Sequence, residues 1–205
     1  MENNIILYGA SGHCKVVIDI LLESSVFIKG ILDDNIYLKQ IFNFPVFNPS
    51  DHRFNTCDKY LISIGDNRIR KEIVFKLFVE YTSAIHPKST VSRFSEIGVG
   101  TVVMAGVIVN PDVKIGKHCI INTAASIDHD CVIEDFSHIS PNASLAGNVF
   151  VGEGSQVGIG ATIMQGIKIG KWVTIGAGAV VINDVPDYAV VVGNPGKVIK
   201  YNSNE

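Results

Sequence analysis

The chain has 205 residues, enough for two small domains, and 47% of them are hydrophobic, enough for a well-buried core. Its 17 basic and 20 acidic residues leave a net charge of −3 at pH 7, so the composition offers no basic surface for nucleic acid or for an anionic membrane. We find no apolar run of about 18 residues and no signal peptide, and we expect a soluble, cytoplasmic protein without a membrane span.

The first 80 residues alternate between short apolar runs, which predict strands, and stretches with helical spacing of apolar residues. Asn67 is placed to cap the second helix, and residues 35–58 are expected to form a loop. Strand–helix alternation predicts a small, Rossmann-like α/β domain with a parallel sheet over residues 1–80. The predicted elements are a strand at 5–8, a helix at 14–22, strands at 26–32 and 60–64, and a helix at 68–80.

Glycine-containing or acidic segments follow all three predicted strands: residues 9–13, Asp33 with Asp34, and residues 65–67. The carboxyl ends of parallel strands are where such sheets bind ligands, so we expect these segments to share a crevice. The Gly9-x-x-Gly12 pair is one glycine short of the dinucleotide fingerprint. It is compatible with a tight turn that binds nothing and with a helix N-terminus that binds a phosphate or carboxylate.

Residues 81–205 are predicted to form a second domain built on a single repeat. Its first residues, 81–87, are expected to link the two domains. Seventeen Val, Ile or Leu residues recur every six positions without a missed step, and this period predicts a parallel β-helix with all of these side chains buried. The repeating residues are Ile85, Val91, Ile97, Val103, Val109, Ile115, Ile121, Ile127, Ile133, Ile139, Leu145, Val151, Val157, Ile163, Ile169, Ile175 and Val181.

Two other positions of the repeat carry structural information. The fourth residue after each aliphatic is small or β-branched from Thr101 onward, so a second inward position is expected there. Glycine often follows the aliphatic directly, as at Gly98 and Gly152, and is predicted to supply an unusual φ angle at a corner. The four cysteines, Cys14, Cys57, Cys119 and Cys131, show no metal-ligand spacing, and buried free thiols without a metal are expected.

Five motifs together resemble one family of enzymes: Gly-Ala-Ser-Gly-His at 9–13, Leu-Asp-Asp at 32–34, Ile-Gly-Asp-Asn at 64–67, Ile-Asp-His-Asp-Cys at 127–131 and Phe-Ser-His at 136–138. In combination with the repeat they resemble the bacterial sugar acyltransferases that N-acetylate nucleotide-linked 4-amino-6-deoxy sugars. Sialic acid O-acetyltransferases have a similar plan. The resemblance implies a left-handed β-helix, a homotrimer with active sites between neighbouring subunits, and acetyl-CoA as the acyl donor.

The resemblance also implies roles for single residues in the repeat. His129 would be the general base, because an amine must lose a proton as it attacks a thioester and imidazole titrates near neutral pH. Asp130, where the family usually has Glu, would orient the ring. Gly147 lies one coil of 18 residues after His129, so its N–H is a candidate oxyanion donor. His138, Ile159, Gly176 and Ala177 would bind acetyl-CoA.

In the α/β domain the family binds the nucleotide sugar. Ser11, Gly12 and His13 would contact sugar or phosphates, and Asp33 and Asp34 would contact the base or ribose through hydrogen bonds that carboxylates accept. Gly65 and Asn67 would line the same crevice.

The predicted function is thus N-acetylation of a 4-amino-4,6-dideoxy sugar linked to a nucleotide, with UDP as the expected nucleotide, in bacterial glycan biosynthesis. Two alternatives stay open, which are a sugar O-acetyltransferase of the sialic acid type and a non-catalytic β-helix scaffold that has no use for His129. A nucleotide-dependent redox or sensor module at 1–80 is a weaker alternative, because the third glycine is missing and the domain is short.

Overall fold

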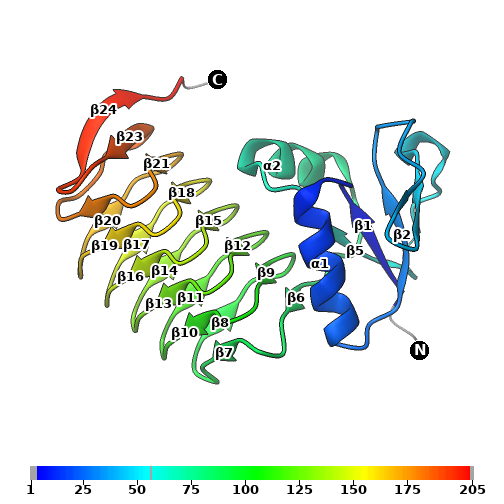
Figure 1. Cartoon of the computed structure of the whole chain (residues 1–205), viewed down its shortest axis with the longest axis horizontal. Coiled ribbons are helices and arrows are strands. Elements are labelled where there is room, and N and C mark those ends of the chain that lie inside the picture. Colours follow the sequence, from blue (N-terminus) through cyan, green and yellow to red (C-terminus); the bar gives the residue numbers. More distant parts are fainter. Residues whose placement is uncertain (1–3, 56, 204–205) are drawn as a thin grey trace.

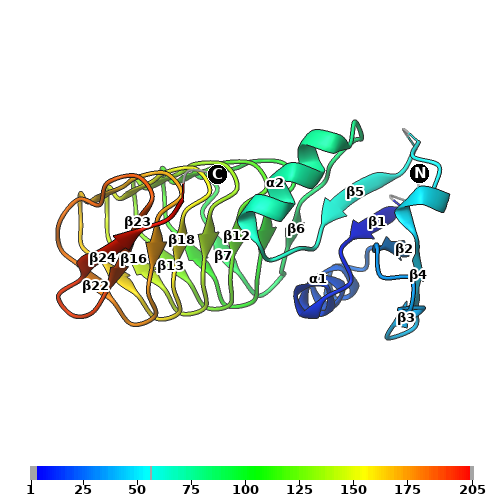
Figure 2. The same cartoon turned by 90° about the horizontal axis from the view of Figure 1, so that it is seen from above.

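The computed structural model describes residues 4–55 and 57–203. An α/β part and a long β-helix lie end to end, with the last strand, β24 (Lys197–Tyr201), at the end of the β-helix far from the α/β part (Figure 1, Figure 2). The predicted fold class, an α/β domain followed by a parallel β-helix of hexapeptide turns, is confirmed. Within the described ranges, no helix has the length and apolar character that a membrane crossing needs.

The α/β part is a five-stranded sheet with a helix on each face, in the strand order β3-β4-β2-β1-β5. All pairs in this sheet are parallel except the β3–β4 hairpin. The elements are β1 (Ile5–Tyr8), α1 (Gly12–Glu23), β2 (Ile28–Leu32), β3 (Gln40–Ile41), β4 (Phe44–Phe47), the 3₁₀ helix η1 (Pro49–Asp51), β5 (Lys59–Ile62) and α2 (Asn67–Lys76).

Three sequence predictions in this part were wrong. The residue that caps α2 is Asp66 rather than Asn67, since its carboxylate accepts the Ile69 N–H at 2.9 Å. The helix ends at Lys76 instead of residue 80, because residues 80–82 return in extended form along β5. The segment predicted to be a loop contains the β3–β4 hairpin, and β4 adds a strand to the sheet beside β2.

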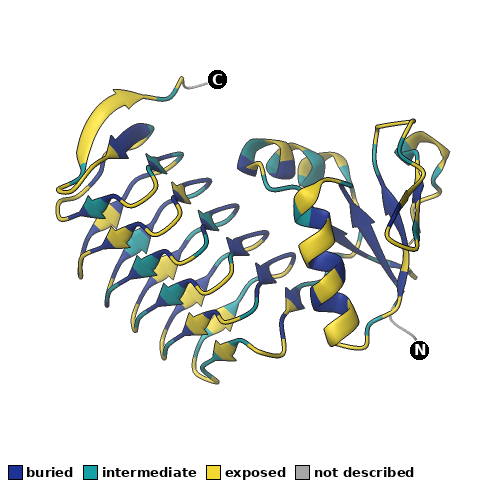
Figure 3. Cartoon of the chain, viewed as in Figure 1, coloured by how far each residue is buried: buried dark blue, intermediate teal, exposed yellow. Residues whose placement is uncertain are grey.

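Helix α1 connects the two parts through a shared apolar core. Its buried residues include Val17, Ile18 and Leu21, and it contacts the first strand of the β-helix, β6 (Ala84–Ile85). The outward side chains Val102 and Ile120 on the next two coils are each 1% exposed and belong to the same core. The first coils are thus covered by the α/β part on one face only (Figure 3).

The β-helix is a three-sided prism whose sides are parallel sheets, joined in the order face 1, face 2, face 3. Face 1 contains β6, β9 (Val102–Val103), β12 (Ile120–Ile121), β15 (His138–Ile139), β18 (Gln156–Val157), β21 (Thr174–Ile175), β23 (Ala189–Val192) and the antiparallel β24. Face 2 contains β7 (Thr90–Val91), β10 (Ile108–Val109), β13 (Ser126–Ile127), β16 (Ser144–Leu145), β19 (Thr162–Ile163) and β22 (Val180–Val181). Face 3 contains β8 (Glu96–Ile97), β11 (Lys114–Ile115), β14 (Val132–Ile133), β17 (Phe150–Val151) and β20 (Lys168–Ile169).

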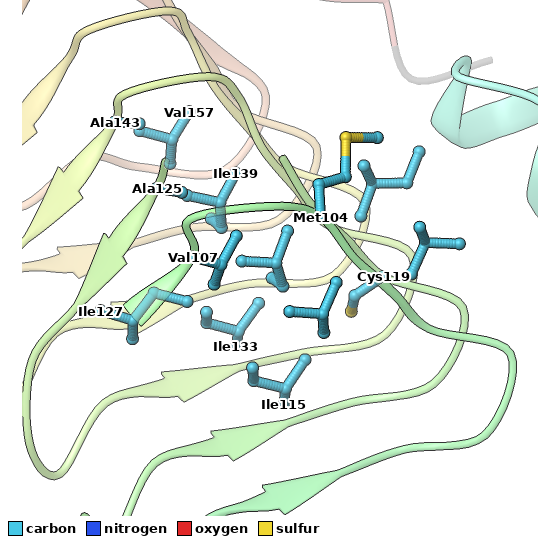
Figure 4. Close-up of a cluster of buried hydrophobic side chains, with 14 of the residues drawn as sticks. Met104, Val107, Ile115, Cys119, Ala125, Ile127, Ile133, Ile139, Ala143 and Val157 are labelled. Carbon is cyan, nitrogen blue, oxygen red and sulfur yellow. The ribbon is translucent and has the colours of Figure 1, made fainter. Parts of the chain in front are cut away.

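The inward positions are those that the period of six predicts, with one correction. Fourteen of the seventeen aliphatic residues, from Val103 to Val181, are at most 4% exposed, and smaller residues such as Ala125 pack between them (Figure 4). Ile85 is 42% exposed, and Val91 and Ile97 are partly exposed. The prediction of burial was wrong for these three because they belong to the first coil, where each strand pairs with a coil on one side only.

The four cysteines follow the prediction in three cases. Cys14, Cys119 and Cys131 are buried free thiols, and burial raises the pKa of each. Cys57 is free but exposed, because it lies in the loop that precedes β5 rather than in a core position.

The corner glycines act by a different mechanism from the predicted one. Left-handed φ angles occur at the third residue after fourteen of the seventeen aliphatics, from Ile97 to Ile175, for example at Asp112 and Gly160, and not at the first. At Gly98 and Gly152 the next coil lies too close for a side chain: a Cβ on Gly98 would lie 2.5 Å from the Gly116 carbonyl carbon, and one on Gly152 would lie 2.6 Å from that of Gly170. These glycines therefore permit tight coil stacking.

The alternation between inward and outward residues predicts opposite effects for two neighbours in β14. Ile133→Ala should lower the free energy of unfolding by about 2–5 kcal/mol, because it leaves a cavity inside the prism. Val132→Ala on the outer surface should change it by about 0.5 kcal/mol or less. Denaturant titration of both variants measures the difference, and equal effects would contradict the register.

Candidate active site

The turn from face 2 to face 3, which we call corner 2–3, holds the predicted base. His129 is exposed, with its ring hydrogen-bonded through Nδ1 to Oδ2 of Asp130 at 2.7 Å. Asp130 has φ +60°, in the left-handed region that Asp112, Asn148 and Gly166 also adopt at this corner and that Asp adopts more readily than most residues. If Nδ1 carries the proton that Asp130 accepts, Nε2 is the ring nitrogen with a free lone pair.

A second carboxylate holds the backbone of this corner. Oδ1 of Asp128 accepts the His129 N–H at 2.8 Å and the Asn110 side-chain N–H at 2.7 Å, from one coil earlier. The Asn110 amide and then the His129 N–H lower the pKa of Asp128, so this residue stays ionised. The hydrogen bond to Asp130, followed by the charge of Asp128, raises the pKa of His129. The corner therefore makes the imidazole a stronger base.

Gly147 forms the floor under the His129 ring. A Cβ on Gly147 would lie 2.6 Å from His129 Cε1 and 2.8 Å from Nε2, so only glycine leaves room for the ring in this position. The two residues are in register one coil apart, because Ile127 pairs with Leu145. Within the part of the chain that the structure describes, we find no backbone acceptor for the Gly147 N–H. That N–H is available to a ligand beside the ring.

The residues predicted to bind acetyl-CoA lie elsewhere on the prism. Ile159, Gly176 and Ala177 are stacked at corner 1–2, the turn from face 1 to face 2. Ile159 is 58% exposed and Ala177 is exposed, so they offer an open apolar ledge. His138 points outward from face 1, where its Nε2 lies 3.0 Å from Nδ2 of Asn122. Burial, then the charges of Arg70 and His13, lowers the pKa of His138 to about 3, so its ring is neutral.

At the carboxyl ends of β1 and β2 the structure brings two predicted segments together. Asp33 is engaged in the fold, since Oδ2 accepts the Ala10 N–H at 2.7 Å and Oδ1 accepts the Asn35 N–H at 2.8 Å. Asp34 is exposed and free to meet a ligand. Ser11 and Gly12 line a cavity of about 360 Å³ whose other residues are Ala10, Lys15, Leu38, Gln40, Ile41 and Phe42.

A second cavity, of about 440 Å³, lies where the α/β part, the β-helix and the C-terminal segment meet. Gly65 and Asn67 line it, whereas Ser11 and Gly12, predicted to share a crevice with them, line the separate 360 Å³ cavity. The sequence analysis missed the rest of the wall, because these residues are far apart in the chain and follow no motif. They are Arg68, Gly154, Gln156, Trp172, Val173, Thr174, Asn202 and Ser203, and Asp66 of the predicted segment 65–67 completes the wall.

The candidate site residues of one chain do not form one site. In a three-sided prism, corner 2–3 lies opposite face 1, and the α/β part with His13, Gly65 and Asn67 packs on face 1. His129 and the crevice are thus on opposite sides of the β-helix. No cluster of His, Cys, Asp or Glu side chains suited to a metal ion occurs in residues 4–55 and 57–203.

Comparison with known proteins identifies relatives of both the α/β part and the β-helix. The family profile of the PglD N-terminal domain matches residues 4–77, and that of the bacterial transferase hexapeptide (six repeats) matches residues 148–183. A UDP-N-acetylbacillosamine N-acetyltransferase of Bacillus subtilis is 38% identical over 111 residues. That alignment spans 50% of this chain and about half, 51%, of the relative.

Solved structures match over nearly the whole chain. The acetyltransferase domain of PglB from Neisseria gonorrhoeae shares 37% identity with a TM-score of 0.91, covering 96% of this chain and 100% of that one. A variant of perosamine N-acetyltransferase from Caulobacter crescentus, solved with CoA and GDP-perosamine, shares 33% identity with a TM-score of 0.90 and covers 98% of each chain. The fold and these matches define a hexapeptide-repeat transferase. The chain belongs to the bacterial hexapeptide-repeat sugar acyltransferase family.

The contact between the imidazole and its neighbour gives a spectroscopic prediction. Asp130→Asn should lower the pKa of His129, because it removes the hydrogen bond that contributes most to raising it. Asp112→Asn removes a carboxylate from the same corner position one coil earlier, where it does not contact the ring, and should have a smaller effect. NMR titration of the His129 ring protons measures both shifts, and equal shifts would show that Asp130 has no specific role.

Proposed function

We propose that this protein transfers the acetyl group of acetyl-CoA to the 4-amino group of a nucleotide-linked 4-amino-4,6-dideoxy sugar, with UDP as the nucleotide, in the bacterial cytoplasm. The observation that carries the proposal is the His129–Asp130 pair above the Gly147 N–H. The relatives support it, since one acts as a UDP-N-acetylbacillosamine N-acetyltransferase and others are solved with acetyl coenzyme A or with CoA and GDP-perosamine. The N-acetyltransferase relatives favour an amine over a hydroxyl acceptor.

The proposed reaction has two steps, which are attack on the thioester carbonyl and collapse of the tetrahedral intermediate. The sugar amine attacks the thioester carbonyl carbon while Nε2 of His129 takes its proton, and Asp130 stabilises the imidazolium through Nδ1. The Gly147 N–H donates to the oxyanion that forms. When the tetrahedral intermediate collapses, the C–S bond breaks and the thiolate of CoA leaves with the proton from His129. The products are the N-acetyl sugar and CoA.

Charge distribution on the β-helix favours a homotrimer that completes this site. Face 2 and corner 1–2 carry no charged residue over five successive coils, at 104–109, 122–127, 140–145, 158–163 and 176–181. Face 3 in contrast presents Glu96, Lys114 and Lys168 outward. An uncharged surface of small side chains is suited to self-association. Three prisms with face 2 toward a common axis would bring corner 2–3 of one chain against corner 1–2 of the next.

This packing resolves the separation seen in one chain. His129 of one subunit would meet the ledge of Ile159, Gly176 and Ala177 on its neighbour. It would also lie near the crevice at face 1 of that neighbour. Acetyl-CoA would lie along the ledge, with its thioester beside the imidazole. The nucleotide sugar would extend from Ser11, Gly12, Asp33 and Asp34 toward Gly65 and Asn67.

Removing the base tests the function. His129→Ala should lower kcat by about 10²–10⁴-fold, the usual contribution of a general base, and should abolish the acid limb of the pH–rate profile. Asp130→Asn should lower kcat less, because the ring remains in place. The assay is CoA release with UDP-N-acetylbacillosamine and with GDP-perosamine. Near-normal kcat in a folded His129→Ala variant would show that His129 is not the base, whereas a folded parent without turnover of either sugar would favour the scaffold alternative.

Two substitutions test the trimer. Ile108→Lys, on face 2 and 44% exposed in one chain, should dissociate the assembly because it buries a charge in the interface. Val132→Lys, on face 3 and 36% exposed, is the matched control and should leave it intact. Light scattering should give three times the 22.2 kDa mass of the chain for the parent and the control. A monomeric parent would contradict the shared active site.

A further inference from the structure

Arg70 is a buried cation with no acidic partner in the described part of the chain. It lies on α2 and is 1% exposed, yet its guanidinium is fully engaged by hydrogen bonds. Burial lowers its pKa to about 10, so it is charged at neutral pH. Its acceptors are His118 O at 2.8 Å, Phe136 O at 2.9 Å, Ile64 O and Gly65 O at 3.1 Å each, and Asn67 Oδ1 at 2.7 Å.

These acceptors come from both parts of the molecule. Two are backbone carbonyls of successive β-helix coils at corner 3–1, the turn from face 3 to face 1. Two more, those of Ile64 and Gly65, lie between β5 and α2, and Asn67 is the first residue of α2. Because Arg70 fixes Oδ1 of Asn67, the Nδ2 of that amide is directed to Gly154 O, 3.0 Å away. Arg70 thus sets the position of two residues, Gly65 and Asn67, that line the 440 Å³ cavity.

The charge of Arg70 also acts on three histidines around it. For each of the three rings, burial lowers the pKa most and the charge of Arg70 comes second. The pKa is lowered to about 4 for His13, to about 4 for His118 and to about 3 for His138. The other charged groups facing these rings are Asp135 and Lys117 for His118, and His13 for His138. Nε2 of His13 is buried and has no hydrogen-bond partner among the described residues.

We propose that Arg70 is a positioning residue for the acceptor: it locks the Gly65–Asn67 wall to the β-helix and keeps His13 neutral for a hydrogen bond to an uncharged sugar hydroxyl. The inference rests on the proposed function. It also makes a sugar hydroxyl a better ligand for His13 than a diphosphate. A diphosphate favours a charged imidazole, and the nearby guanidinium opposes the charged form. The hydroxyl of a sugar can both donate to and accept from a neutral ring nitrogen.

Two variants separate the two roles. Arg70→Lys keeps the charge but loses the planar five-donor fork, so it should weaken binding of UDP-N-acetylbacillosamine by about tenfold or more while His13 still titrates near pH 4. Arg70→Gln removes the charge as well. Burial remains, so the pKa of His13 should rise only part of the way toward 6.5. As pH falls, binding should then begin to weaken at a higher pH in Arg70→Gln than in the parent, since the neutral ring is lost as pH falls through the raised pKa.

Calorimetry with the nucleotide sugar and with acetyl-CoA, together with NMR titration of His13, supplies the readouts without depending on turnover. Arg53→Gln, an exposed arginine of the same domain, is the matched control and should change none of them. A folded Arg70→Lys variant that binds the sugar nucleotide as the parent does, or a folded Arg70→Gln variant that leaves both the pH dependence of binding and the His13 titration unchanged, would overturn the proposal. A parent that binds acetyl-CoA but neither UDP-N-acetylbacillosamine nor GDP-perosamine would instead contradict the proposed function.

Discussion

Hydrogen bonding between coils exactly one turn apart in the chain is the constraint on which the rest of the structure depends. Each coil takes 18 residues, so Ile127 pairs with Leu145 and His138 with Gln156. The short distance between coils excludes a Cβ at Gly98 and Gly152 and stacks the aliphatic residues into one apolar column. The same register puts the Gly147 backbone under the His129 ring. A chemical feature of the site therefore follows from a rule of the scaffold.

The three flat faces of the prism also keep the α/β part and the His129 corner of one chain apart. The α/β part needs an apolar surface for α1, and it finds one on face 1, where Val102 and Ile120 are covered. The His129 corner lies opposite that face. Under the proposed function, a rigid prism cannot bend to join acceptor and base, so a neighbouring chain must supply one of them. The uncharged face 2 gives that neighbour a surface to pack on.

The period of six was sufficient to predict the β-helix and its inward positions, because every coil repeats one physical requirement. It could not reveal that the first coil lacks a neighbour below, which exposes Ile85. It also assigned the wrong cause to Gly98 and Gly152, since a glycine required by crowding looks the same in sequence as one required by φ. Arg70 was missed for a related reason. Four of its five acceptors are backbone carbonyls, which leave no trace in side-chain identity.

The pairing of His129 with Asp130 shows how one residue of the scaffold can meet two requirements. At corner 2–3 the third position after the aliphatic is left-handed on four successive coils, and Asp112, Asn148 and Gly166 fill it on the other three. Asp, Asn and Gly are the residues that adopt this conformation most readily. Asp130 meets the same requirement and also reaches His129 Nδ1 at 2.7 Å. The family usually has Glu here, but the shorter side chain of Asp130 still reaches the ring. One residue thus serves the turn and, under the proposed mechanism, the base.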